Sequence, residues 1–419
     1  MTATVTAPVR ARRLPLAAAA TCLLSFALFW WAQRAAHVSM VDLRVYRAEG
    51  ATALAGRELY DMIATESNLP NTYPPFASLL FIPLTLPDVP LLRTLATAGN
   101  LLLLVALVRL SLRLVGRDRP ADDWLNRPET VLWVSAVLVW CEPVWTTLRY
   151  GQINLLLAVA VLWDFTRRPG SRWAGVGTGL AAAVKLTPAL FVVFTLVVAV
   201  VRARGGKDAG PWLRQSLTAI GTFLAATAVG ALALPRDSHR FWTEVMFQAG
   251  RVGKAEETAN QSLRGVLARL LHTEDPGLWW LLVAVLAGAA GLALAVRAGA
   301  RGDVALGVVA CAVTALLVSP ISWSHHWVWC VPALLLLKER AGWKWAAGLA
   351  FAFGSFALWW VPHTHGARLE LHQNGWQMLA SGVYVLAAAV LLAKLWRTQA
   401  PAQGVQGRDP GRLQAVANE

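Results

Sequence analysis

The chain has 419 residues, of which 56% are hydrophobic and only 15% are charged. Soluble proteins carry about 25% charged residues, so this composition excludes a soluble globular protein and indicates a polytopic membrane protein. The formal charge of +14 does not indicate nucleic-acid binding, because the basic residues lie between apolar segments rather than on one face. No polar block is long enough to bury its own core. We therefore expect one membrane domain over 14–397, with cytoplasmic tails at 1–13 and 398–419.

Apolar segments that approach the roughly 20 residues needed to cross a bilayer recur along the whole chain. They are 14–36, 91–115, 129–147, 150–165, 212–235, 278–297, 303–320, 323–338, 343–361 and 375–396. Basic clusters largely alternate with them, which predicts cytoplasmic termini. The first segment is too long for a cleavable signal and is expected to be a retained anchor. With two irregular regions added, the sequence predicts an all-α bundle of about 11–13 transmembrane helices.

The first irregular region is 74–87, an apolar segment of only about 14 residues. It lies between a predicted outer loop at 37–72 and the span 91–115, which ends in the basic cluster 109–119. An odd number of crossings must separate the outer loop from an inner basic cluster. Either the short segment is re-entrant, or the basic cluster lies exceptionally on the outside.

The second irregular region, 172–201, has basic residues at both ends and should cross an even number of times. Pro188 disfavours a helical conformation at Thr187, so two half-helices that break at 185–188 are expected. Lys185 lies at this break, and a lysine exposed to lipid costs several kcal/mol. We therefore expect Lys185 to face a polar site. The alternative is one tilted helix from which Lys185 reaches the membrane surface.

The predicted outer face holds a concentration of polar chemistry. It comprises 37–72, 142–150, 185–188, 236–276, 319–325 and 362–374. All eight histidines fall on this side, namely His37, His239, His272, His325, His326, His363, His365 and His372. We therefore look for the active site on the outer face.

Carboxylates cluster in the first outer loop of an otherwise acid-poor chain. They are Asp42, Glu49, Glu58, Asp61 and Glu66. Asp42 follows the first span by only a few residues and should lie at the membrane surface. Such a carboxylate is either a solvated loop charge or a general base that faces a membrane-embedded site.

A polar hinge separates the spans 129–147 and 150–165. Glu142 begins it, Gly151 permits a tight turn, and Gln152 and Asn154 supply amide groups at the membrane edge. The hinge is either a capped helix hairpin or one wall of a binding site.

Two further outer motifs have ambiguous roles. Asn260 and Gln261 belong to a weak glycosylation sequon, or they contribute polar side chains to an outer cavity. His325 and His326 are adjacent in 319–327, and successive helical side chains point about 100° apart. Both therefore cannot readily face one metal ion, whereas one can face a cavity while the other packs.

Neither metal nor nucleotide sites have support in the sequence. The cysteines lie within or beside apolar segments, which predicts buried thiols rather than disulfides: Cys22, Cys141, Cys311 and Cys330. His363, His365 and His372 lack carboxylates at metal-ligand spacing. No GxGxxG follows a strand and no Walker sequence is present. No metal and no cofactor is predicted.

Taken in order, these motifs resemble the GT-C superfamily of polytopic glycosyltransferases, and most closely glycosyltransferase family 87. That family includes polyprenol-phosphate-mannose-dependent α-(1,2)-mannosyltransferases. The matching pieces are 42–46, 73–75, 142–143, 151–154, 185–188, 260–262 and 319–326. Each motif alone is weak evidence for the family, but seven motifs in the same order are specific for it. They run from the first loop to about residue 330.

The resemblance implies transfer of a sugar, most simply mannose, from a polyprenyl phosphate to a lipid or glycan acceptor on the outer leaflet, with inversion at the anomeric carbon. It implies that Asp42 is the catalytic base, that His326 or His325 orients it or relays protons, and that Lys185 and Arg149 bind the donor phosphate. The implied substrate-binding residues are Tyr46, Tyr73, Glu142, Gln152, Asn154, Asn260, Gln261 and Trp323. Its partners would be the lipid-linked donor, the acceptor and membrane lipids, with no nucleic acid and no known protein partner.

Other interpretations stay open at the level of sequence. An arabinofuranosyl donor is compatible with the same motifs. A secondary transporter would also have a broken helix with an intramembrane lysine, although it would more often show internal repeats. A non-catalytic lipid-binding scaffold would not require the loop carboxylates and histidines.

Overall fold

The computed structural model describes residues 10–117, 119–120, 123–363 and 367–398. The predicted all-α fold is confirmed, because the strands among these residues form only one short antiparallel hairpin, β1 (Ile63–Ala64) with β2 (Leu69–Pro70). Residues 1–9 and 399–419 of the two predicted tails lie outside the described residues. So does His365.

The helices of the N-terminal half are α1 (Arg10–Ala35), α2 (Val41–Leu54), α3 (Pro75–Phe81), α4 (Val89–Val115), α5 (Pro128–Leu138), α6 (Glu142–Tyr150), α7 (Asn154–Phe165), α8 (Val176–Val184) and α9 (Ala189–Arg204). Those that follow are α10 (Gly210–Ala233), α11 (Pro235–Thr243), α12 (Leu263–Leu270), α13 (Gly277–Ala300), α14 (Val304–Val318), the 3₁₀ helix η6 (Ser324–Trp329), α15 (Cys330–Ala341), α16 (Trp343–Gly354), α17 (Gly375–Ser381) and α18 (Val383–Thr398).

Several helices have the length and surface of membrane spans. By length and composition, α1, α4, α10 and α13 can each cross a bilayer, and the described part of the chain reaches six spans if two bent helix pairs count as one each. The start of α13 leaves Leu278, Trp279 and Leu286 at least 66% exposed, which suits contact with lipid rather than water. The chain is a multi-pass membrane protein. The total of 11–13 crossings stays a prediction.

Two predicted spans are bent rather than continuous. The prediction of one helix over 129–147 was wrong, because α5 and α6 meet at 77°. Cys141 is extended between them, and Pro143 starts the new helix because its missing N–H needs no partner in a first turn. The segment 375–396 likewise divides at Gly382 into α17 and α18, which meet at 69°.

The four cysteines are buried and free, as predicted. Gly151 also adopts the predicted tight turn, with φ 69° and ψ 34° directly after α6. A left-handed backbone of this kind favours glycine because it has no Cβ.

The region 172–201 folds back on itself as two half-helices, which excludes the single tilted helix. Lys185 is extended, with φ −148° and ψ 126°, between α8 and α9. Both basic ends of the pair pack beside the start of α10. Arg214 of α10 donates to the carbonyl of Gly170 at 2.8 Å, and Arg202 donates to the carbonyl of Asp208 at 2.8 Å. The pair is therefore re-entrant, with 185–188 at its tip.

The short segment 74–87 does not cross the bundle. It forms α3 and a 3₁₀ turn, and Phe76 packs closely against Gly230 near the end of α10. The chain then enters α4 beside the end of α1, where Arg34 donates to Thr94 at 2.9 Å. Its two ends thus lie at one end of the bundle, which agrees with the re-entrant alternative.

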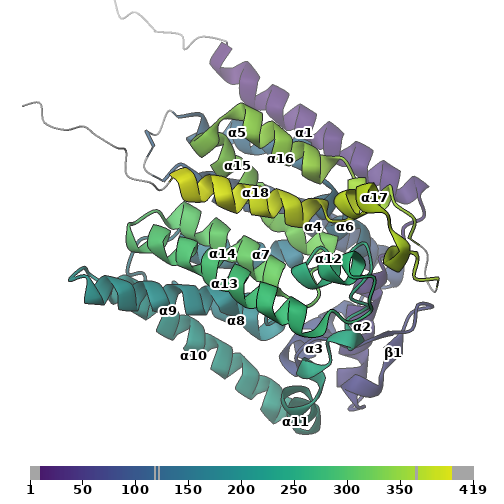
Figure 1. Cartoon of the computed structure of the whole chain (residues 1–419). Helices are drawn as coiled ribbons and strands as arrows, with labels where there is room; N and C mark the ends of the chain where they lie inside the picture. The colour runs from purple at the N-terminus through teal and green to yellow at the C-terminus, as the bar shows by residue number, and fades with distance from the viewer. Residues whose placement is uncertain (1–9, 118, 121–122, 364–366, 399–419) are drawn as a thin grey trace, which may run out of the picture.

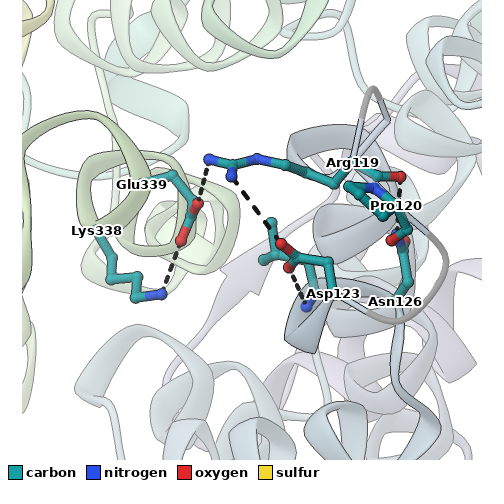
Figure 2. Close-up of polar contacts among 7 residues, drawn as sticks. Arg119, Pro120, Asp123, Asn126, Lys338 and Glu339 are labelled. Carbon is teal, nitrogen blue, oxygen red and sulfur yellow. Dashed lines mark hydrogen bonds and ion pairs between the residues drawn. The ribbon is translucent and has the colours of Figure 1, made fainter.

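The irregular elements gather at one end of the helix bundle. Figure 1 shows α2, α3, β1, α11, α12 and α17 there, and we call this the site end. The opposite end is joined by ionic contacts. Figure 2 shows Arg119 reaching both Glu339, at 3.0 Å, and Asp123, at 4.0 Å, while Lys338 contacts Glu339 at 2.7 Å.

Replacing Gly50 with alanine should destabilise the fold where α2 packs on the turn after α3. A Cβ at Gly50 would lie 2.4 Å from the carbonyl oxygen of Phe81, so a backbone must move. We expect a loss of about 1–3 kcal/mol, measured as a lower apparent Tm in detergent. Gly221→Ala in α10 is the matched control, because no atom lies within 4 Å of its Cβ. Equal Tm values for the two variants would contradict the close packing of α2.

Candidate active site

Asp42 lies in the first turn of α2, at the site end. The chain reaches this helix through Met40, whose left-handed backbone (φ 50°, ψ 60°) turns the chain out of the first span. Burial raises the pKa of Asp42 from 3.8 to about 6, against the opposing effects of a hydrogen bond from Gln152 and the charge of Lys185. The carboxylate is therefore a stronger base than an ordinary aspartate but still mostly ionised at neutral pH.

The amide that contacts Asp42 is itself held in place. Tyr46, one turn after Asp42, donates its hydroxyl to Gln152 Oε1 at 2.7 Å, and the hydroxyls of Tyr46 and Tyr73 are 2.9 Å apart. With its oxygen occupied, Gln152 presents its amide hydrogens to Asp42. Residues from α2, the hinge after α6 and the loop before α3 thus fix the orientation of the carboxylate.

Lys185 points from the tip of the re-entrant pair into the same region. Its Nζ is 2.9 Å from His326 Nε2 and 3.3 Å from Asn154 Oδ1, and it lies 5.6 Å from the centre of the Tyr73 ring. Neither hydrogen-bond partner is a carboxylate. Asn154 is oriented by its own Nδ2, which donates to the carbonyl of His325 at 3.0 Å. An ammonium held this way is suited to receive an anion.

Two cavities meet at Asp42. The first, which we call the Lys185 cavity, measures about 270 Å³, and the second, which we call the Glu256 cavity, measures about 360 Å³. The predicted site residues on the Lys185 cavity are Asp42, Tyr46, Tyr73, Gln152, Lys185, Trp323 and His326. Those on the Glu256 cavity are Asp42, Trp323 and His325. Asp42 and Trp323 line both, so Asp42 can contact two different ligands.

The adjacent histidines face different cavities. Their rings are 4.8 Å apart and perpendicular. His326 lines the Lys185 cavity, while His325 lines the Glu256 cavity and packs edge-on against Tyr150 at 5.4 Å. The expectation that only one of them faces a cavity therefore does not hold.

Five predicted site residues lie off the walls of both cavities: Arg149, Glu142, Asn154, Asn260 and Gln261. Arg149 is exposed at the end of α6. Glu142 is fully buried and accepts hydrogen bonds from Thr146, Ser324, Trp359 and Tyr384. Its oxygens are already satisfied by the protein, which leaves it a positioning role.

Asn260 and Gln261 are also fully buried and bind backbone groups. Asn260 Nδ2 donates to the carbonyl of Ala255 at 2.9 Å, and its Oδ1 accepts from the amide of Ser322 at 3.0 Å. Gln261 donates to the carbonyl of Thr258 at 2.7 Å. These amides hold the loop 255–262 against the loop before η6 and thereby shape the Glu256 cavity.

Sequence reasoning missed several residues on the cavity walls. Arg251 lines the Lys185 cavity and is anchored by donating from Nε to the carbonyl of Asn71 at 2.8 Å and to the carbonyl of Tyr60. Glu256 and Trp359 line the Glu256 cavity. The outer loop 236–276 was predicted, but no local motif distinguishes Arg251 or Glu256 within it. Among the described residues, no group of three or more His, Cys, Asp or Glu side chains is placed to hold a metal ion.

Comparisons with known proteins agree with this geometry. Residues 71–320 match the model of glycosyltransferase family 87. A Mycolicibacterium smegmatis protein named polyprenol-phosphate-mannose-dependent alpha-(1-2)-phosphatidylinositol mannoside mannosyltransferase is 33% identical over 377 residues, 82% of this chain and 81% of its own. The Mycobacterium tuberculosis protein of the same name is 33% identical over 373 residues, 84% of this chain and 83% of its own.

A second Mycobacterium tuberculosis protein is named polyprenol-phosphate-mannose-dependent alpha-(1-2)-phosphatidylinositol pentamannoside mannosyltransferase. It is 35% identical over 324 residues, 73% of this chain and 70% of its own. No solved structure matches the chain. The family match spans more than half of the sequence, and the relatives cover more than two thirds of it. The chain therefore belongs to glycosyltransferase family 87 and is a membrane glycosyltransferase.

Proposed function

We propose that this enzyme transfers mannose from a polyprenyl-phosphate donor to a hydroxyl of a lipid or glycan acceptor, with inversion at the anomeric carbon. The observation that carries the proposal is the position of Asp42, a basic carboxylate where a cavity containing Lys185 meets a second cavity. The names of the relatives support mannose and a polyprenol phosphate as the donor.

The reaction needs one proton transfer and one exchange of bonds at the anomeric carbon. Asp42 removes the proton of the acceptor hydroxyl as that oxygen forms a bond to the anomeric carbon. The bond from this carbon to the phosphate oxygen breaks, and its electron pair leaves with the polyprenyl phosphate. Attack from the face opposite the leaving phosphate inverts the centre, as in inverting glycosidases. The proton on Asp42 then passes to solvent.

The departing phosphate gains negative charge, and the Lys185 cavity has the cations to stabilise it. Lys185 and Arg251 line this cavity from different elements, so two cations can contact one phosphate. His326 keeps Lys185 in place through their 2.9 Å contact. We assign the second cation to Arg251 rather than Arg149, because Arg149 is exposed and away from both cavities.

We further propose that the site end faces the periplasmic or extracellular side of the cell membrane, with both termini cytoplasmic. Arginines such as Arg117, Arg167 and Arg202 lie toward the opposite end of the bundle, where Arg117 donates to the carbonyl of Arg167 at 3.0 Å. The positive-inside rule places such residues in the cytoplasm. A lipid-linked donor then reaches the Lys185 cavity from the outer leaflet.

Arabinofuranose remains the alternative sugar, because the contacts to phosphate and the base would serve either donor. Family membership and the cavity geometry favour an enzyme over the transporter and the scaffold. The experiment that separates the donors supplies purified protein with polyprenyl-phosphate mannose or polyprenyl-phosphate arabinofuranose and follows the label into lipid. We expect transfer from the mannosyl donor, and transfer only from the arabinosyl donor would replace mannose in the proposal.

Asp42→Asn should lower the transfer rate by about 10²–10⁴-fold, because an amide cannot accept the proton. The measurement is transfer of radiolabelled mannose by purified protein, with apparent Tm and donor binding recorded in parallel. The variant should keep its Tm and bind the donor, since asparagine has nearly the same shape. Turnover near the wild-type rate would remove Asp42 as the base.

The rate should also depend on pH through Asp42. Only the ionised carboxylate accepts a proton, and its pKa is about 6 instead of 3.8, so kcat/KM should fall about tenfold per pH unit below about 6. Gln152→Leu should move this limb to higher pH, because the hydrogen bond from Gln152 stabilises the ionised form. A profile that stays flat down to pH 4.5 would contradict the burial of this carboxylate.

The phosphate-binding assignment separates three basic residues. Lys185→Ala should lower kcat/KM for the donor by about 100-fold and Arg251→Ala by about 10-fold, because each loses a charge-assisted contact to the phosphate. Arg149→Ala is the matched control and should leave donor kinetics unchanged. A large effect of Arg149→Ala with none of Arg251→Ala would reverse the assignment.

A further inference from the structure

The Glu256 cavity contains none of the cations assigned to the donor phosphate. Its walls combine aromatic faces with acidic groups and the imidazoles of His325 and His363. Tyr150, Trp323 and Trp359 supply the aromatic faces, while Glu256 and His325 supply polar groups. The cavity shares only Asp42, Leu69, Val252 and Trp323 with the Lys185 cavity. The enzyme therefore has a second, chemically distinct compartment that opens onto the same base.

Three polar atoms on this wall are buried without a hydrogen-bond partner in the described part of the chain: Glu256 Oε1, His325 Nε2 and Arg368 Nη1, the last of which forms an ion pair with Glu274. Glu256 is only 2% exposed and His325 only 6%. The carboxylate of Glu256 forms an ion pair with Arg368, whose Nε lies 3.9 Å from Oε1, a distance beyond that of a hydrogen bond. Burying a polar atom without a hydrogen-bond partner is costly, so Glu256 Oε1 and His325 Nε2 are suited to form hydrogen bonds with a ligand.

The charges of the wall indicate which ligand it takes. Asp42, Glu256, Glu257 and Glu370 line the cavity, against the cations Lys254 and Arg368. This excess of carboxylates repels a phosphate. Carboxylate oxygens instead accept hydrogen bonds from hydroxyl groups, and aromatic faces pack against the C–H face of a sugar ring.

We infer that the Glu256 cavity binds the terminal neutral sugar of the acceptor and presents one of its hydroxyls to Asp42, while any phosphate of the acceptor lies outside the cavity. This inference rests on the proposed function and names the acceptor chemistry of the same site. Glu256 accepts a hydrogen bond from a sugar hydroxyl that is not the attacking one. Recognition of the acceptor then depends on its last sugar rather than on its lipid phosphate.

The test uses octyl α-mannoside, a neutral mannoside without inositol or phosphate, as the acceptor and polyprenyl-phosphate mannose as the donor. Wild-type enzyme should transfer mannose to it. Glu256→Gln should raise KM for octyl α-mannoside by about 10-fold, because the sugar hydroxyl loses its hydrogen bond to a charged carboxylate oxygen. KM for the donor should stay unchanged. Met246→Ala is the mirror control, since Met246 lines only the Lys185 cavity, and should raise KM for the donor alone.

Three results would overturn the inference. KM for octyl α-mannoside could be unchanged in Glu256→Gln, or it could fall, as expected if an anionic group occupied the cavity. Both KM values could instead rise together with a loss of apparent Tm, which would indicate a structural role for Glu256.

Binding without transfer separates this inference from the proposed donor. Quenching of tryptophan fluorescence by octyl α-mannoside should saturate with the wild type, because Trp323 and Trp359 line the cavity. The affinity should be about 10-fold weaker in Glu256→Gln. Such binding in an enzyme that transfers nothing from polyprenyl-phosphate mannose supports the sugar cavity while rejecting the donor. Transfer to a natural lipid acceptor with no binding of the mannoside would reject the sugar cavity and keep the donor.

Discussion

The buried carboxylate of Glu142 ties together the elements that carry the active site. It lies at the start of α6 and accepts hydrogen bonds from Ser324 of η6, at 2.8 Å, and from Tyr384 of α18, at 2.6 Å. Trp359 also donates to it at 3.1 Å. These hydrogen bonds offset the cost of burying a carboxylate, so they hold the segments that donate them in one arrangement. That arrangement places His325 and His326, which follow Ser324 directly, on the walls of two separate cavities.

We propose that each of the two cavities binds one substrate, because their walls differ in chemistry. A donor phosphate requires cations, and Lys185 and Arg251 line one cavity. An acceptor sugar requires hydrogen-bond acceptors and aromatic faces, and Glu256 and Trp359 line the other. Asp42 lies on both walls, where a base must be if it takes a proton from one substrate as that substrate attacks the other. In our proposal, the two cavities hold the two substrates and Asp42 is the base that they share.

Local rules of the backbone made part of this structure predictable. The break at 185–188 follows from the restriction that Pro188 imposes on the preceding residue, and the turn at Gly151 follows from its missing Cβ. The bend between α5 and α6 was not predicted, because the apolar run continues through Val139 and Trp140 and hydropathy does not record helix direction, although Pro143 marks the start of α6. Hydropathy alone therefore finds the bundle but not its bends.

Asp42, Lys185 and the two histidines were predicted from chemistry that is unusual at a membrane surface, and all four line the two cavities. Asn260 and Gln261 are residue types that often bind ligands, but their side-chain amides form hydrogen bonds with backbone groups instead. Arg251, Glu256 and Trp359 lie outside the matching motifs, and tertiary packing brings them to the cavities. The most direct test is a structure with a non-transferable mannosyl phosphonate of a polyprenol. The phosphonate should lie within hydrogen-bond distance of Lys185 Nζ with the anomeric carbon facing Asp42, whereas a phosphonate in the Glu256 cavity would contradict the account.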